Sequence, residues 1–236
     1  MASSTRSVYY QNCARRSRCG LPDATAPQTV IYLTGAKNNS CTHFYDNGTL
    51  GVLNTPSVGY KLHPQWIWAA DNGCFNATTY VGDTKWFTWL QKQPTHRCLF
   101  ATAPDVVGNH VETLTRSLPW LKQIRDLGFQ VAFVLQNGST TDTIPWHEFD
   151  VAFIGGDNSW KLGGADHLII EAKQRGKKVH VGRVNSGKRF ERFALMGVDS
   201  VDGTHLAFAP DRNLASLLSW IRKEETHQPL WTVEYA

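Results

Sequence analysis

The sequence predicts an α/β protein built as a compact TIM-type (β/α)8 barrel. Three observations indicate this fold: short apolar runs alternate with segments of helical periodicity, most runs are apolar throughout, and most end on a polar residue or a glycine pair. Near-continuous apolar strands are typical of a parallel sheet covered on both faces, and their alternation with helices indicates repeated βαβ units. A length of 236 residues suffices for one small barrel, so we expect a single barrel domain over residues 1–236.

Seven segments are expected to be strands. They are Thr29–Thr34, Trp66–Ala70, Cys98–Thr102, Gln130–Leu135, Val151–Ile154, Lys178–Val181 and Asp199–Val201. Residues 1–62 are the hardest part to interpret, because only the first of these segments and the stretch SVYYQN at positions 7–12 resemble strands there. The eighth strand is therefore inferred from the fold.

Between the strands, apolar residues recur at three- and four-residue steps, as in helices that bury one face. The periodic sets are Val111, Leu114, Leu118, Leu121 and Ile124; Ala165, Leu168 and Ala172; Phe190, Phe193 and Ala194; and Leu214, Leu217, Leu218 and Ile221. Glycine follows the first three sets, as is common just after a helix ends. Asp211 is the expected N-cap of the last helix.

Chemically capable residues stand at the carboxyl ends of six predicted strands. They are Asp71, Asp105, Gln136, Gly155-Gly156, Gly182-Arg183 and Asp202. A doubly wound open sheet would also fit the alternation, but its strand ends spread along a line and only the switch point binds ligands. In a closed barrel all these ends meet at one mouth. Six polar strand ends therefore favour the barrel.

Asp71 and Asp202 are the two carboxylates with the clearest catalytic potential. At one mouth, one carboxylate can attack an electrophilic carbon, while the other transfers a proton if burial or its neighbour raises its pKa. Cleavage of a glycosidic bond divides the work in this way. Acids at strand ends more often cap helices or join ion pairs, so position alone leaves the structural role open.

Asp105, Gln136 and Phe75 together suggest a site for a flat ring that forms hydrogen bonds. A carboxylate can accept from an adjacent N–H and amino group, the pair on the Watson–Crick edge of guanine. Gln136 or a backbone N–H of Gly155-Gly156 can donate to a carbonyl oxygen, since glycine permits close approach. Phe75 can stack on the ring. Singly, the three side chains also suit a helix cap, a loop amide and a core aromatic.

Eight basic residues fall between positions 173 and 192, although the net charge of the chain is only +4. They are Lys173, Arg175, Lys177, Lys178, Arg183, Lys188, Arg189 and Arg192. Such a cluster suits a nucleic-acid backbone, and the candidate contacts are its last four members. A solvated helix face explains the same charges equally well.

Cysteine usage and hydropathy favour a reducing compartment. Five cysteines, an odd number, fit free thiols better than a disulfide framework. A zinc set of Cys13, Cys19, Cys41 and His43 would lack the close cysteine pair of structural sites, so no metal is expected. The apolar runs are too short to span a bilayer and the first residues lack the apolar core of a signal peptide, so we expect a cytoplasmic protein without glycosylation.

Six short motifs resemble, in order, those of the queuine-type tRNA-guanine transglycosylase family. The stretches DNGCF, APD, LQNG, IGGD, VGRVNSGKR and GVDSVDGT are similar to the family's D-S-G-G-F, F-D, V-Q-G-G, I-G-G, G-V-G-x-P and G-V-D-x-F-D. They run from about Asp71 to Asp202, on successive predicted strands. The resemblance implies a TIM barrel, in agreement with the residue pattern.

The resemblance also implies a role for each matching residue. Asp202 would be the nucleophile that captures the sugar C1′, and Asp71 the general acid/base that serves the leaving and incoming purines. The residues implied to contact the base are Phe75, which would stack on it, Asp105, Gln136 and Gly156, which would read its edge, and Val181, which would form the opposite wall. No cofactor is implied, because one glycosidic bond replaces another.

Departures from the family pattern point away from tRNA. The family's C-x-C-x₂-C…H zinc subdomain is missing, since no cysteine follows Cys98. Cys74 and Asn137 replace the second glycines of two motifs, and the loop after Gly156 reads DNSWKLGG. A compact, zinc-free barrel resembles the phage-borne and bacterial DNA transglycosylases that place 7-deazaguanine bases in DNA.

From this resemblance we expect a DNA-guanine transglycosylase, with DNA as partner and a preQ0-like 7-deazaguanine as the incoming base, in a bacterial or phage-infected cell. Three alternatives stay open. They are exchange of guanine in tRNA, hydrolysis of a purine nucleoside, and a non-catalytic barrel that binds nucleic acid or a free deazapurine.

Overall fold

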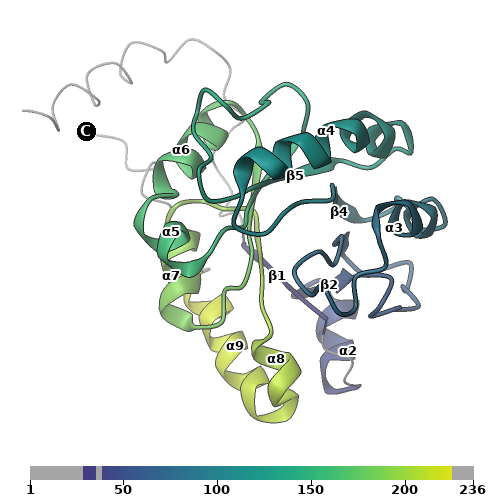
Figure 1. Cartoon of the computed structure of the whole chain (residues 1–236). Coiled ribbons are helices and arrows are strands. Elements are labelled where there is room, and N and C mark those ends of the chain that lie inside the picture. The colour runs from purple at the N-terminus through teal and green to yellow at the C-terminus, as the bar shows by residue number, and fades with distance from the viewer. Residues whose placement is uncertain (1–28, 36–38, 225–236) are drawn as a thin grey trace, which may run out of the picture.

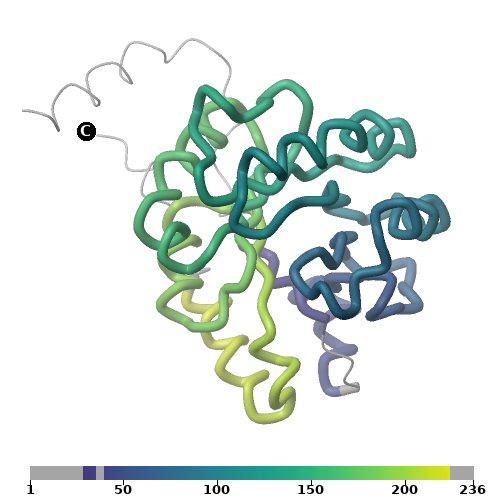
Figure 2. Tube along the Cα trace, viewed as in Figure 1, coloured from purple at the N-terminus to yellow at the C-terminus, as the bar shows by residue number. Residues whose placement is uncertain are grey.

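The computed structural model describes residues 29–35 and 39–224, in which eight parallel strands close into a barrel (Figure 1). The strands are β1 (Ile31–Thr34), β2 (Leu50–Asn54), β3 (Trp68–Ala70), β4 (Cys98–Thr102), β5 (Val131–Leu135), β6 (Val151–Ile154), β7 (Lys178–Val181) and β8 (Ser200–Asp202). Each strand pairs with its neighbours in sequence, and β1 pairs with β8. Figure 2 shows this closure, where purple β1 runs beside yellow-green β8. The predicted fold class is confirmed.

Seven strands coincide with predicted ones to within two residues, and β2 is the strand that sequence reasoning missed. Its sequence, LGVLN, has a glycine at its second position, which weakens any strand pattern. A Cβ on Gly51 would lie 2.4 Å from the Leu33 side chain, so the barrel wall needs a glycine there. The stretch at positions 7–12 lies outside the described residues.

Helices follow six of the eight strands within the part of the chain that the structure describes. They are α2 (Asn39–Asp46), α3 (Asp83–Leu90), α4 (His110–Asp126), α5 (Asn158–Gly163), α6 (Asp166–Gln174), α7 (Gly187–Leu195), α8 (His205–Phe208) and α9 (Pro210–Glu224). Turns alone connect β2 to β3 and β5 to β6. In the second connection the Phe149 ring stacks on Phe133 of β5 and covers the strand in place of a helix.

All four periodic sets of apolar residues lie in or directly before helices, namely α4, α6, α7 and α9. One predicted cap is wrong: α9 begins at Pro210, so Asp211 lies in its first turn. Proline suits the first position of a helix because its φ is already helical and its missing N–H is not needed there. No helix among the described residues is long and apolar enough to cross a bilayer.

Two apolar layers hold the barrel together. The inner layer fills the barrel and consists of Leu33, Ala69, Phe100, Ala132, Val134, Val151 and Phe153. The outer layer lies between strands and helices and includes Trp68 of β3, Val181 of β7 and Phe190 of α7. Side chains of a strand alternate between its two faces. A residue two positions after an inner-layer residue, toward the carboxyl end of the strand, therefore also points inward and lies at the mouth.

Candidate active site at the barrel mouth

The two carboxylates singled out in the sequence both lie at the mouth of the barrel, at the carboxyl ends of their strands. Asp71 directly follows β3, and Asp202 is the last residue of β8. Asp71 lies two positions beyond the inward-facing Ala69, so its side chain also points inward. Asp202 points inward as well, because its carboxylate contacts His180, whose ring packs against the inner layer. The negative charge of Asp202 adds to the effect of burial in raising the pKa of Asp71.

Asp71 is held by the turn that it starts. Its Oδ1 accepts a hydrogen bond from the backbone N–H of Gly73 at 2.7 Å, and Gly73 has a φ of +79°, which suits glycine. Burial raises the pKa of Asp71 to about 7; the charges of Asp202 and Asp105 add to this effect, and the Gly73 hydrogen bond opposes it. A carboxyl group that titrates near neutrality can both donate and accept a proton.

Asp202 is 9% exposed and both of its carboxylate oxygens are engaged. Oδ1 accepts from the backbone N–H of Arg183 at 3.1 Å, and Oδ2 lies 3.0 Å from Nε2 of His180. A Cβ at Gly182 would stand 3.2 Å from Oδ2 and 2.7 Å from the Phe153 ring, so glycine leaves the space beside the carboxylate open. Arg183 has a φ of +61°, a costly backbone conformation for a residue with a side chain.

Asp105 lies in a buried network of amides beside the two catalytic candidates. Its Oδ1 accepts from Nδ2 of Asn72 at 2.7 Å, and its Oδ2 accepts from Nε2 of Gln136 at 2.6 Å. Burial raises the pKa of Asp105, whereas the two amide hydrogen bonds and the charge of Arg116 act in the opposite direction. The carboxylate is thus fixed in orientation, and each oxygen has a second lone pair for a ligand.

The predicted use of the Gly155-Gly156 backbone to read a base is not supported. The N–H of Gly156 donates to Oε1 of Gln136 at 2.8 Å, and the N–H of Gly155 donates to the carbonyl of Leu135. Oε1 of Gln136 also accepts from the N–H of Gly108 at 2.9 Å. Gln136 therefore ties the loops after β4 and β6 to Asp105.

Phe75 and Arg183 are in contact with each other at the mouth. The Phe75 ring is 64% exposed, and the guanidinium carbon of Arg183 lies 4.7 Å from its centroid. The same guanidinium donates to the backbone carbonyl of Gly156. These contacts join the loops after β3, β6 and β7 above the carboxylates, and the cation–π contact is weak enough to open for a ligand.

Val181 does not form a wall of the mouth, contrary to the prediction. It is the last residue of β7 and follows His180, whose ring packs against Phe100 and Phe153 of the inner layer. Val181 therefore points outward and belongs to the layer beneath the helices. The side chain that packs against the Phe75 ring at the mouth is Arg183.

The basic run from 173 to 192 does not form one surface. Lys173 and Lys178 bind Asp199 at the amino end of the barrel, 2.9 and 3.0 Å from its oxygens. Lys188 and Arg189 follow β7 and lie in the first turn of α7, at the mouth end. The run is divided because β7 crosses the full height of the barrel.

Two of the four predicted nucleic-acid contacts are engaged within the protein. Arg183 takes part in the mouth contacts described above, and Arg192 binds both oxygens of Asp166 at 2.9 and 2.7 Å. Lys188 is exposed and makes no ion pair within the described part of the chain. Arg189 is half-buried, with a 3.5 Å contact to the Asn158 side chain.

Sequence reasoning missed three polar residues of the site, Asn72, His180 and Lys161. Asn72 adjoins Asp71, and His180 is a polar residue between two valines of a predicted strand; both are signals that could have been used. Lys161 is buried in α5, and its ammonium donates to the Gly182 carbonyl. Burial lowers the pKa of Lys161 to about 8, with the charge of Arg183 adding to this and that of Asp202 opposing it.

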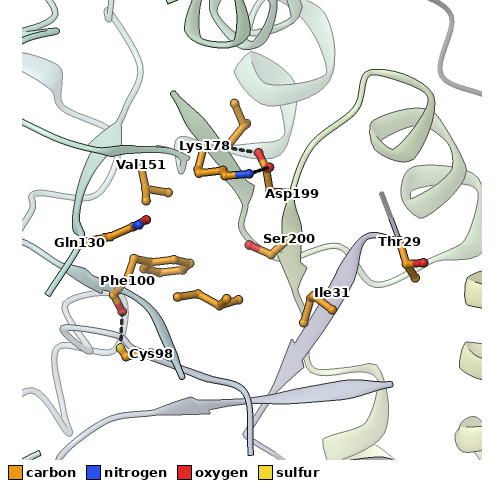
Figure 3. A pocket seen from close by; sticks show the side chains of 11 residues that line it. Thr29, Ile31, Cys98, Phe100, Gln130, Val151, Lys178, Asp199 and Ser200 are labelled. Carbon is orange, nitrogen blue, oxygen red and sulfur yellow. Dashed lines mark hydrogen bonds and ion pairs between the residues drawn. The ribbon is translucent and has the colours of Figure 1, made fainter. Parts of the chain in front are cut away.

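A cavity of about 340 Å³ lies at the opposite, amino end of the barrel (Figure 3). Lys178, Asp199, Phe100 and Ser200 are among its lining residues, and neither Asp71 nor Asp202 reaches it. No group of three or more His, Cys, Asp or Glu side chains among the described residues could hold a metal ion. Cys13 and Cys19 of the considered zinc set lie outside those residues.

Comparison with known proteins supports the fold. No protein-family model and no curated protein sequence matches the chain. Among solved structures, 3-hexulose-6-phosphate synthase from Salmonella typhimurium is 16% identical, covers 83% of this chain and 99% of its own, and has a TM-score of 0.51. Ligand-free tryptophan synthase from M. tuberculosis is 13% identical over 84% of this chain and 92% of its own, with a TM-score of 0.55. At these identities the similarity concerns the barrel alone.

Proposed function

We propose that this chain is a base-exchanging transglycosylase that replaces guanine in DNA with a 7-deazaguanine base through a covalent aspartyl–sugar intermediate. The main support is the position of Asp71 and Asp202 at one mouth, where their charges interact. The similar barrels are synthases, and barrels of this kind carry their chemistry at the carboxyl ends of the strands.

The mechanism assigns opposite tasks to the two carboxylates. A carboxylate oxygen of Asp202 attacks C1′ of the target nucleotide, the bond between C1′ and N9 breaks, and guanine leaves with a proton from Asp71. The incoming base then gives its N9 proton to Asp71, its N9 bonds to C1′, and the ester to Asp202 breaks. Asp71 is suited to both proton transfers because its pKa of about 7 lies close to neutral pH.

Asp105 supplies the recognition of the base in this proposal. Its carboxylate, held by Asn72 and Gln136, can accept from the adjacent N–H and amino group that guanine and preQ0-like 7-deazaguanines share. The exposed Phe75 ring would stack on the base once the Arg183 guanidinium moves aside. Unstacking the nucleotide from the duplex costs a few kcal/mol, which contacts in the pocket offset.

DNA is the preferred nucleic acid because the resemblance is to zinc-free enzymes and no cysteine follows Cys98. Lys188 and Arg189 at the start of α7 would contact the backbone beside the mouth. Such an enzyme would act in the cytoplasm of the cell that holds the DNA.

The deciding experiment incubates the full chain with duplex DNA or with tRNA, in each case carrying labelled guanine, and with preQ0. We expect release of labelled guanine from DNA, a preQ0 nucleoside by mass spectrometry of the DNA, and a DNA–protein adduct on denaturing gels. Asp202→Asn should abolish exchange and adduct together.

Each other result contradicts a defined part of the proposal. Release from tRNA alone would make the substrate tRNA. Guanine release that leaves a free C1′ would indicate hydrolysis, and binding of DNA or preQ0 without release would indicate a non-catalytic barrel. Full activity of Asp202→Asn would remove Asp202 from the nucleophile role.

A further inference from the structure

His180 is a fully buried polar residue that connects Asp202 with the interior of the barrel. It is 0% exposed, and the Phe100 and Phe153 rings pack against its imidazole with centroids 4.8 and 4.4 Å away. Its Nε2 lies 3.0 Å from Oδ2 of Asp202, and its Nδ1 lies 2.8 Å from Oγ of Ser200. The contacts with two aromatic rings and a partner at each nitrogen hold the imidazole in one orientation.

The two contacts also define which nitrogen carries hydrogen toward Asp202. An ionised carboxylate only accepts hydrogen bonds, so Nε2 must be the donor to Asp202. The Ser200 hydroxyl can donate to Nδ1, and this favours the tautomer with hydrogen on Nε2. Ser200 thus acts on the carboxylate through the ring, as an outer hydrogen-bond partner fixes the tautomer of a metal-binding histidine in other proteins.

We propose that His180 is a positioning residue that stabilises Asp202 as the leaving group in the second half of base exchange. The inference rests on the proposed function. When Asp202 attacks C1′, its negative charge declines and the hydrogen bond from Nε2 weakens. When the N9 atom of the incoming base forms its bond to C1′, the ester bond breaks and its electron pair returns to Asp202. The same hydrogen bond then strengthens, because bonds to ionised acceptors are the stronger ones.

The two half reactions therefore respond differently to loss of the donor. Only an interaction that is stronger in the transition state than in the preceding ground state accelerates a step. The His180 hydrogen bond meets this condition for breakdown of the ester and not for its formation. A residue that merely supports the barrel would affect both steps alike.

The test measures the two steps separately in single-turnover experiments with the full chain. Adduct formation is followed on DNA without an incoming base, and adduct decay is followed after addition of preQ0. For His180→Leu combined with Ser200→Ala, which avoids an unpaired hydroxyl, decay should slow by about tenfold to a hundredfold. Formation should stay within about threefold, so the adduct accumulates at steady state.

His180→Gln is the matched variant, because its side-chain amide can still donate to Asp202. It should restore decay most of the way to the wild-type rate. Ser200→Ala alone relaxes the tautomer and should give a smaller slowing of decay. These two variants keep the test decisive if the double variant fails to fold.

Equal slowing of both steps would overturn the inference. So would unchanged decay in the double variant or, if that variant does not fold, unchanged decay in Ser200→Ala. That result is distinct from failure of the proposed function, in which the wild-type protein forms no adduct and exchanges no base on either nucleic acid. The contact itself has a separate readout in ¹⁵N NMR of the imidazole. The Nε2 resonance should move in Asp202→Asn, and an unmoved resonance would contradict the contact.

Discussion

The two ends of the barrel use the same residue type in opposite ways. At the amino end, Asp199 binds Lys173 and Lys178 and accepts the N–H of Val179 at 2.7 Å. Asp150 likewise binds Arg125 there and accepts a backbone N–H at 2.9 Å. These carboxylates clamp the first residues of neighbouring strands.

At the mouth, the three carboxylates of the candidate site have no such cationic partners. Asp71 and Asp105 form no ion pair with another side chain among the described residues, and the pKa of each is raised by burial. Asp202 has His180 as its side-chain partner. In a barrel of this kind the amino end serves stability and the carboxyl end serves function, and the difference in pairing follows that division.

The largest expected effect is at the mouth, for Asp71→Asn. If Asp71 transfers the proton as proposed, its loss should slow exchange by about 10²- to 10⁴-fold. We expect the same change to stabilise the fold at pH 8. The carboxyl binds its proton more tightly in the folded state, with a pKa of about 7 against 3.8, so ionisation penalises folding increasingly as the pH rises from about 4 to 7.

Asparagine cannot ionise, so the stability difference has a defined pH profile. The free energy of unfolding of Asp71→Asn should equal that of the wild-type protein below pH 4 and exceed it by about 2 kcal/mol above pH 7. A pKa shift of three units represents roughly 4 kcal/mol, and we expect part of this to be recovered. Urea unfolding of both proteins across this range measures it. A gain that does not depend on pH would show that desolvation of Asp71 is not its cause.

The division between the ends was predictable only in part. Asp71 and Asp202 could be placed together from the sequence because the carboxyl ends of parallel strands meet at one mouth. The alternation of strand side chains would have pointed Val181 outward, but the family resemblance placed it at the mouth. The hydrogen bonds of Gln136 to Gly108 and Gly156 join three loops, and Lys161 reaches β7 from α5; no local pattern encodes such contacts.

The basic run shows a second limit. Its members are close in sequence, but a strand of four residues, Lys178–Val181, separates them into the two ends of the molecule. Charged residues that are neighbours in sequence share a surface only if they lie at the same end of the strand. Predicting this requires knowing where the strand begins and ends. Strand β2 was missed for a different reason. The glycine at position 51 interrupts the apolar pattern of the strand, yet the packing against Leu33 leaves no room for a larger side chain there.

The next largest effect is expected at the amino end, for Asp199→Asn. The amide can still accept the N–H of Val179, but both lysines lose their anionic partner. Because these pairs are partly exposed, the free energy of unfolding should fall by about 1–2 kcal/mol. Exchange per folded molecule should not change.

Asp150→Asn is the matched control, since its pair with Arg125 is more exposed and should cost less. Urea unfolding and an exchange assay normalised to folded protein measure both properties. Loss of exchange in fully folded Asp199→Asn would contradict the separation of stability and function between the two ends.

The smallest effect distinguishes the two ends by charge alone. Lys188→Gln with Arg189→Gln removes two positive charges at the mouth, and Lys177→Gln with Lys178→Gln removes two at the amino end. Only the mouth pair should weaken DNA binding, because only those residues lie beside the site where a nucleotide would enter. If both residues of the mouth pair contact phosphates, the slope of log Kd against log salt should fall by about 1.8 for that pair and stay unchanged for the amino-end pair.

Titrations of a labelled duplex at several salt concentrations measure the slopes. An equal loss of DNA binding in both double variants would mean that the positive charges act through the net charge of the protein. A larger loss in the amino-end variant would place the DNA at the end of the barrel opposite Asp71 and Asp202.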